Sequence, residues 1–189
     1  TLQGLFISGD ITHSSTSAAA AGSYHSLTKE VAVILGIMFK HAFPHWYERY
    51  RLAFDAGVWL PEDPGPFLGR AVIFKLQGRL HKDRQDLGPS VCFGVGRYSG
   101  AEMLFPQFGA KLAYLPGEVC IFYSSDLYHM VAPYQALQPS EEDKRDQISP
   151  GRIGSVFFFP KESFKELYDK PEGWGYKTQW GKNSHLFAV

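Results

Sequence analysis

The chain has 189 residues, of which 44% are hydrophobic and 20% charged, and its formal net charge at neutral pH is zero. This length suits one domain with a sizeable core, and no run approaches the ~20 apolar residues of a membrane span. The neutral total excludes an overall positive field, but a short basic groove can hide within it, so charge neither supports nor excludes a nucleic-acid partner. The start lacks the apolar region of a secretory signal, so we expect an intracellular protein, nuclear or cytoplasmic.

Two helices are predicted after an N-terminal arm. Residues 1–25 are rich in Ser, Thr, Ala and Gly, a composition typical of a flexible arm, and we expect a single domain over residues 26–189. The first helix begins at Ser26 or Thr28 as its cap, and its apolar residues are expected to pack on a sheet. These apolar residues recur at helical spacing: Leu27, Val31, Ile34, Leu35, Met38 and Phe39. A second helix is predicted over His45–Ala56.

The rest of the chain is mainly β. After a proline-rich loop at 61–66, short apolar segments alternate with turns, and a charged excursion at 135–150 interrupts them. The pattern predicts an α+β, mainly β fold, a double-stranded β-helix (jelly roll) with flanking N-terminal helices. The expected strands are Ala71–Gln77, Ser90–Arg97, Ala101–Phe105, Lys111–Tyr114, Val119–Tyr123, His129–Pro133 and Ile153–Phe159. A short helix is expected at Lys161–Tyr168.

A candidate metal site follows from strand geometry. His81 and Asp83 come at the end of an apolar run, and side chains two residues apart in an extended segment share one face. His129 follows a second apolar run, so the three side chains can meet on one side of an ion. Two imidazoles and one carboxylate with open positions form the facial triad that suits Fe(II). The alternative is a solvated strand end with satisfied histidines.

Arg152 opens the apolar strand that ends at Phe159. A guanidinium fork binds a carboxylate through two hydrogen bonds, and it stays charged when partly buried. The alternative is a surface salt bridge to the acidic residues 141–143. Arg145, in the most hydrophilic part of the chain, is the other candidate for binding the carboxylate.

The order His81-x-Asp83, then the stretch ending at His129, then Arg152 resembles the Fe(II)/2-oxoglutarate-dependent dioxygenases, most closely the TET/JBP-type oxygenase domains of fungi. The resemblance covers about residues 69–159. It implies His81, Asp83 and His129 as iron ligands, Arg152 as the partner of the distal carboxylate of 2-oxoglutarate, and O₂ as cosubstrate. Many members have Ser or Thr two residues beyond the arginine, whereas this chain has Gly154, so a second hydrogen bond to the cosubstrate must come from elsewhere.

The implied activity is hydroxylation of a C–H bond, and the methyl group of a modified nucleobase (5-methylcytosine-like) in DNA or RNA is the first candidate substrate. The same chemistry on a protein side chain or a small metabolite is the alternative, and an inactive jelly-roll binding module is a third. Several aromatic residues are expected mostly in the core, with stacking on a flipped base as their alternative role. They are Phe93, Phe105, Phe108 and Tyr114. Asp126 and Tyr128 are candidates to orient the His129 ring. The histidines without a carboxylate partner at strand spacing are expected at the surface or at helix ends: His25, His41, His45 and His185.

Overall fold

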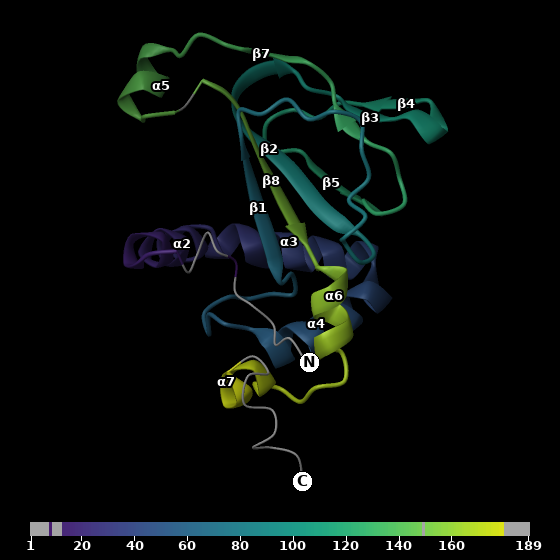
Figure 1. The fold of residues 1–189 in the computed structure, drawn as a ribbon. Helices are drawn as coiled ribbons and strands as arrows, with labels where there is room; N and C mark the ends of the chain where they lie inside the picture. Colours follow the sequence, from purple (N-terminus) through teal and green to yellow (C-terminus); the bar gives the residue numbers. More distant parts are fainter. Residues whose placement is uncertain (1–7, 9–12, 149, 180–189) are drawn as a thin grey trace. The chain divides into compact units, whose positions relative to one another are not determined.

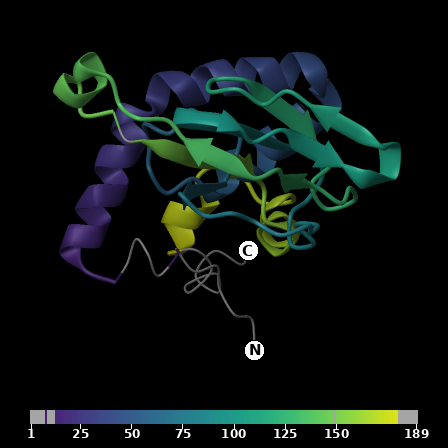
Figure 2. The same ribbon diagram turned by 90° about the horizontal axis from the view of Figure 1, so that it is seen from above.

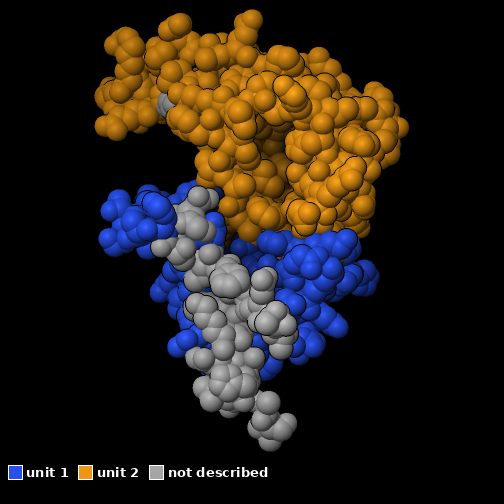
Figure 3. All heavy atoms as spheres, viewed as in Figure 1, with its two compact units in different colours: residues 1–68, 160–189 blue, residues 69–159 orange. Residues whose placement is uncertain are grey.

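The structure, a computed structural model, describes residue 8, residues 13–148 and residues 150–179. The chain divides into two compact units, whose boundaries lie inside the single domain predicted from the sequence. Unit 1 contains residues 1–68 and 160–189, and unit 2 contains residues 69–159 (Figure 3). All the residues that the sequence predicted for the metal and cosubstrate sites lie in unit 2.

Unit 1 is helical. Its helices in the described part of the chain are α2 (Ser15–Leu27), α3 (Lys29–Ala42), α4 (Pro44–Gly57), α6 (Lys161–Leu167) and α7 (Trp174–Thr178). Their core is aromatic: the Phe39 ring lies 5.3 Å from that of Tyr50 and 4.9 Å from that of Phe67. No helix within the described ranges is long and apolar enough to cross a membrane.

Helix α2 differs from the predicted arm, because residues 15–25 are helical. Ser14 caps the helix by accepting a hydrogen bond from the backbone N–H of Ser17 at 3.1 Å. The alanine run that looked like a linker is also the strongest helix-forming composition. No residue of α2 is buried, so local propensity and capping support this helix together with a few contacts near its end, those of His25 with Asp63 and Trp59. The rest of the predicted arm, residues 1–7 and 9–12, lies outside the described residues.

Helix α3 begins after Thr28, one of the two predicted caps, but the Thr28 side chain does not cap it and its buried face differs from the prediction. The Thr28 hydroxyl donates to the Tyr24 carbonyl at 2.6 Å, so it binds the end of α2 rather than capping α3, and the two helices meet at a steep angle (Figure 2). Leu35 and Phe39 are buried as predicted, but Ile34 and Met38 are exposed. The helix is apolar on nearly all sides, so spacing alone does not single out the face that packs.

Unit 2 consists of two antiparallel sheets (Figure 1). The larger has the order β1-β8-β2-β5, with β7 also paired to β2, and the smaller has the order β4-β3-β6. The strands are β1 (Gly69–Phe74), β2 (Ser90–Gly100), β3 (Met103–Phe105), β4 (Ala110–Leu112), β5 (Val119–Phe122), β6 (Met130–Val131), β7 (Tyr134–Ala136) and β8 (Gly151–Phe158). The chain is therefore α+β and rich in sheet, and the strands of the described residues do not close into a barrel.

The charged excursion contains structure that the sequence did not predict. Strand β7 pairs with the far end of β2, and helix α5 (Glu141–Arg145) follows it. Ser140 and Asp143 form a capping box at the start of α5, and Asp143 also accepts from Arg97 Nε of β2 at 2.7 Å. A three-residue strand has too few positions for a recognisable period, so only its pairing with β2 reveals β7.

Candidate metal centre

Backbone hydrogen bonds place the two histidines next to each other. The N–H of His81 donates to the His129 carbonyl at 3.1 Å, and the N–H of His129 donates to the His81 carbonyl at 2.9 Å. The N–H of Asp83 donates to the Ser124 carbonyl at 2.9 Å. Residues 81–83 therefore run beside residues 124–129, which brings segments more than forty residues apart into register.

The side chains of these residues converge. His81 Nε2 lies 3.3 Å from Asp83 Oδ1, and His129 Nε2 lies 3.4 Å from Asp83 Oδ2. One ligand atom from each of the three residues lies within 4.8 Å of the others. Donors at right angles about one small divalent ion, each about 2.1 Å from it, are about 3 Å apart. The spacing of the three side chains thus fits a common ion.

Both imidazoles have their second nitrogen occupied. His81 Nδ1 lies 2.6 Å from the Arg79 carbonyl, and His129 Nδ1 lies 2.9 Å from the Leu127 carbonyl. A carbonyl only accepts, so each Nδ1 donates a hydrogen bond to its carbonyl, and Nε2 of each ring faces Asp83. This outer hydrogen bond is the usual arrangement for histidines that bind metal, because it fixes both tautomer and ring orientation.

The charge of Asp83 also acts on His129. Burial lowers the pKa of His129, but its hydrogen bonds to Asp83 and to the Leu127 carbonyl, together with the charge of Asp83, outweigh burial and raise the pKa overall. The negative charge of Asp83 that favours a proton on His129 would equally favour a metal cation between the carboxylate and the imidazole. The donor set and its charge therefore match a divalent metal ion.

Asp86 is a neighbour that sequence reasoning missed. Its Oδ2 accepts from the hydroxyls of Ser90 and Ser124, each at 3.0 Å, and the three residues are buried. Burial and then the charge of Asp83 raise the pKa of Asp86 to about 6, although both serine hydroxyls oppose the shift. Its place three residues after Asp83 in the sequence does not by itself reveal this burial.

A cavity of about 360 Å³ opens beside the three residues, and unit 2 is hollowed on the face that Figure 3 shows. Its walls come from both sheets and from the 76–86 segment. The lining is mostly apolar and includes Ile73, Cys92, Met103, Val131, Val156 and Phe158. An apolar cavity of this size with a few convergent polar groups is the usual form of a small-molecule site.

Arg152 lines the same cavity and is buried. Its guanidinium lies against two glycines that face each other across β2 and β8, Gly94 and Gly154. A Cβ at Gly154 would lie 2.8 Å from Arg152 Nη1, and one at Gly94 would lie 3.1 Å from Nε. The two glycines thus leave the space that the guanidinium occupies. Arg152 Nε has no hydrogen-bond partner among the residues that the structure describes.

The alternatives for the arginine are placed elsewhere. Arg145 is exposed on α5 near Glu142 and Asp146, outside the cavity lining. Asp143, one of the acidic residues that the alternative interpretation paired with Arg152, instead pairs with Arg97. Arg152 therefore does not pair with the acidic loop.

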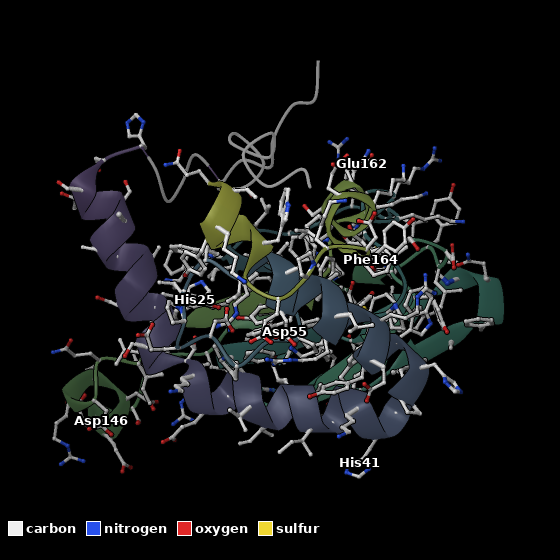
Figure 4. All side chains as sticks on the ribbon, turned by 90° about the horizontal axis from the view of Figure 1, so that it is seen from below. His25, His41, Asp55, Asp146, Glu162 and Phe164 are labelled. Atoms are coloured by element: carbon white, nitrogen blue, oxygen red, sulfur yellow. The ribbon has the colours of Figure 1, made fainter. Side chains whose placement is uncertain are left out.

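The other residues singled out in the sequence lie at different places in the structure. Phe105 and Tyr114 are in the core, whereas Phe108 is exposed. Asp126 and Tyr128 do not hold the His129 ring, because the Leu127 carbonyl does so. His41 points away from the protein in Figure 4, whereas His25 contacts Asp63 Oδ2 through Nδ1 at 3.2 Å. His185 lies outside the described residues.

Comparisons with known proteins give a fold likeness. No protein-family model matches the chain, and neither does any curated protein. Among solved structures, NgTET1 in complex with 5mC DNA is similar, with a TM-score of 0.59 and 16% sequence identity. The likeness covers 94% of this chain and 63% of the NgTET1 chain, so this chain spans less than two thirds of that protein. At this identity the comparison shows that the two chains share a fold.

Proposed function

We propose that this chain is an Fe(II)- and 2-oxoglutarate-dependent dioxygenase of the TET/JBP type, built on a double-stranded β-helix. The observation that carries the proposal is the convergence of His81, Asp83 and His129 at a cavity that also contains the buried Arg152. The fold shared with NgTET1 supports it.

His81, Asp83 and His129 would hold the iron through Nε2, a carboxylate oxygen and Nε2. Bound iron would supply the oxidation of a C–H bond with O₂ and 2-oxoglutarate, chemistry that belongs to the cofactor. The protein's part is to bind and shield: two backbone carbonyls lock the imidazoles, and the apolar lining keeps water from the site.

Arg152 would bind the distal carboxylate of 2-oxoglutarate. Its guanidinium is buried and faces no carboxylate among the described residues. An unpaired buried cation is costly, and an anionic ligand would remove that cost. The Arg152 site and the three proposed iron ligands border one cavity, so one dicarboxylate could reach both.

For the substrate we propose the methyl group of a modified nucleobase, 5-methylcytosine-like, in DNA or RNA. NgTET1 was solved with 5mC DNA, which favours this class. The segment that borders the cavity supports it, because it carries four cations that are not among the lining residues, with Asp83 as the one acidic residue between 75 and 84: Lys75, Arg79, Lys82 and Arg84. Cations at this position suit phosphate contacts while a flipped base enters the cavity.

The test is succinate formation by the Fe(II)-loaded protein, with Asp83→Ala as the inactive variant. Oligonucleotides with and without 5-methylcytosine, methylated peptides and a panel of small metabolites are supplied in parallel. Succinate that rises only with the methylated oligonucleotide, with oxidised base detected by mass spectrometry, supports the full proposal. Succinate that rises with a peptide or metabolite keeps the chemistry and moves the substrate. A wild-type protein that binds neither metal nor 2-oxoglutarate leaves a jelly-roll binding module as the better description.

A further inference from the structure

Tyr114 is a lining residue of the cavity, and it has a second buried polar group without a partner among the described residues. Its side chain is 2% exposed, and its hydroxyl has no hydrogen-bond partner among the described residues. Tyr114 lines the same cavity as Arg152, and the Arg152 guanidinium carbon lies 5.2 Å from the centre of the Tyr114 ring. A buried hydroxyl without a partner is unfavourable, so its position calls for an explanation.

The backbone around Tyr114 fixes where this hydroxyl lies. The hydroxyl of Tyr98 donates to the Tyr114 carbonyl at 3.3 Å, and the N–H of Gly117 donates to the Gly94 carbonyl at 2.8 Å. These bonds tie the segment after β4 to β2, the strand that also faces Arg152. Tyr98 uses its proton within the protein, whereas Tyr114 does not.

The hydroxyl of Tyr114 can donate a hydrogen bond to an incoming ligand. Burial is the main cause that raises the pKa of this phenol far above its usual value, although the charge of Arg152 opposes the shift. The phenol therefore keeps its proton at every physiological pH. A protonated phenol beside a guanidinium suits a carboxylate, which accepts hydrogen bonds and carries a negative charge.

Position 154 explains why the site would need the Tyr114 hydroxyl as a donor. Many members of the family that the sequence resembles have Ser or Thr there, but a side chain at Gly154 would collide with the guanidinium. We propose that the Tyr114 hydroxyl is the second hydrogen-bond donor to the ligand carboxylate that Arg152 binds, and so takes the place of the missing hydroxyl at position 154. This inference rests on the proposed function, because it takes 2-oxoglutarate as the ligand.

The experiment compares Tyr114→Phe with wild type, both loaded with Mn(II), which binds without turnover. Tyr134→Phe is the matched control, because Tyr134 lies on β7 and does not line the cavity. Titration calorimetry measures the affinity for 2-oxoglutarate and for 2-oxovalerate, which has a methyl group in place of the distal carboxylate. Thermal unfolding of the ligand-free proteins is measured alongside.

We expect Tyr114→Phe to weaken 2-oxoglutarate about tenfold to hundredfold, the range for a hydrogen bond to a charged group. The affinity for 2-oxovalerate should not change, and Tyr134→Phe should bind both ligands like wild type. The ligand-free melting temperature of Tyr114→Phe should equal or exceed that of wild type, because the hydroxyl loses no protein partner.

The experiment distinguishes a failure of this inference from a failure of the proposed function. Equal 2-oxoglutarate affinity in Tyr114→Phe and wild type overturns this inference and leaves the proposed function intact. An equal loss for both ligands, or a lower melting temperature without ligand, also overturns it, because the hydroxyl would then serve another atom. Wild-type protein that binds Mn(II) but no 2-oxoglutarate removes the proposed function and this inference together.

Discussion

At position 154 the absence of a side chain shapes the anion site. The Gly154 backbone faces Gly94 across the sheet, and together they leave room for the guanidinium of Arg152. The glycine at position 154 is therefore matched by the position of the arginine. Adding a hydroxyl-bearing side chain at this position should harm the site rather than improve it.

The first prediction tests this close contact. Gly154→Ala should weaken 2-oxoglutarate about tenfold in the Mn(II)-loaded protein, because its Cβ displaces a charged hydrogen-bond donor. The guanidinium is the far end of a flexible side chain, so it can move and the fold should persist. Gly22→Ala is the control, since an added Cβ there meets nothing within 4 Å. Unchanged 2-oxoglutarate affinity in Gly154→Ala would place the anion away from Arg152.

The second prediction concerns Asp83, whose carboxylate contacts both imidazoles. Asp83→Ala should weaken the binding of Mn(II) or Co(II) by more than about a hundredfold, beyond the effect of removing an outer hydrogen-bond partner of a metal ligand. The side chain is partly exposed and its contacts are to the two histidines, so circular dichroism should show an intact fold. Asp126→Ala, which removes an exposed carboxylate, should bind metal like wild type. Retained metal affinity in Asp83→Ala would show that the ion, if any, lies elsewhere.

At the scale of elements, Asp143 joins helix α5 of the charged excursion to the sheet, in addition to the pairing of β7 with β2. The side chain of Asp143 caps α5 together with Ser140, and it also accepts from Arg97 on β2. The pKa of Asp143 is lowered first by the hydrogen bond from Arg97 and then by the backbone N–H of Ser140. Asp143 therefore stays ionised, and its carboxylate connects α5 to β2 in a segment with few apolar residues.

The third prediction removes this fastening. Asp143→Ala should make trypsin cut after Lys144 or Arg145 about tenfold faster, because cleavage follows the population of open α5 and the variant loses its helix cap. Glu142→Ala, an exposed residue of the same helix, serves as the control. Metal affinity should be the same in all three proteins, since α5 lies outside the cavity lining. Equal cleavage rates in Asp143→Ala and Glu142→Ala would refute this role of Asp143.

At the scale of the whole molecule, the buried carboxyl of Asp86 makes stability depend on pH. Its ordinary pKa is 3.8 and its pKa in the fold is about 6, so the folded protein holds a proton that the unfolded chain releases between these values. The stabilisation is complete below pH 3.8 and is lost as the pH rises through 6. Above that pH the folded protein has a buried charge beside Asp83.

The fourth prediction follows from this sign. Asp86→Asn should raise the free energy of urea unfolding at pH 7.5, and the difference from wild type should shrink as the pH falls from 6 to 4. Protein with a metal chelator is used, so that a bound ion does not stabilise the charge. Circular dichroism reports both units, whereas tryptophan fluorescence does not report unit 2, since no tryptophan occurs between residues 69 and 159. A wild-type curve and a variant curve that stay parallel over pH 4–7.5 would contradict the shifted pKa.

Features that depend on a few neighbouring residues could be predicted from the sequence. The strands β2, β5 and β8 lie close to their predicted ranges because runs of apolar β-forming residues encode them locally. His81 and Asp83 were expected on one face because alternation is a property of the extended backbone, and their side chains do lie 3.3 Å apart. The choice of His, Asp and Arg as candidates came from the chemistry of their side chains and from a family resemblance.

Features that depend on distant contacts were decided by the tertiary structure. The hydrogen bonds between His81 and His129 join segments 48 residues apart by number, and the register of two strands is not written in either strand alone. The roles of Asp86 and Tyr114 emerge only when burial and the neighbouring charges are known, because an isolated Asp or Tyr in a sequence carries no sign of its environment. The sequence by itself therefore determined which groups could do chemistry, and the folded chain determined which of them meet, since long-range packing sets both distance and desolvation.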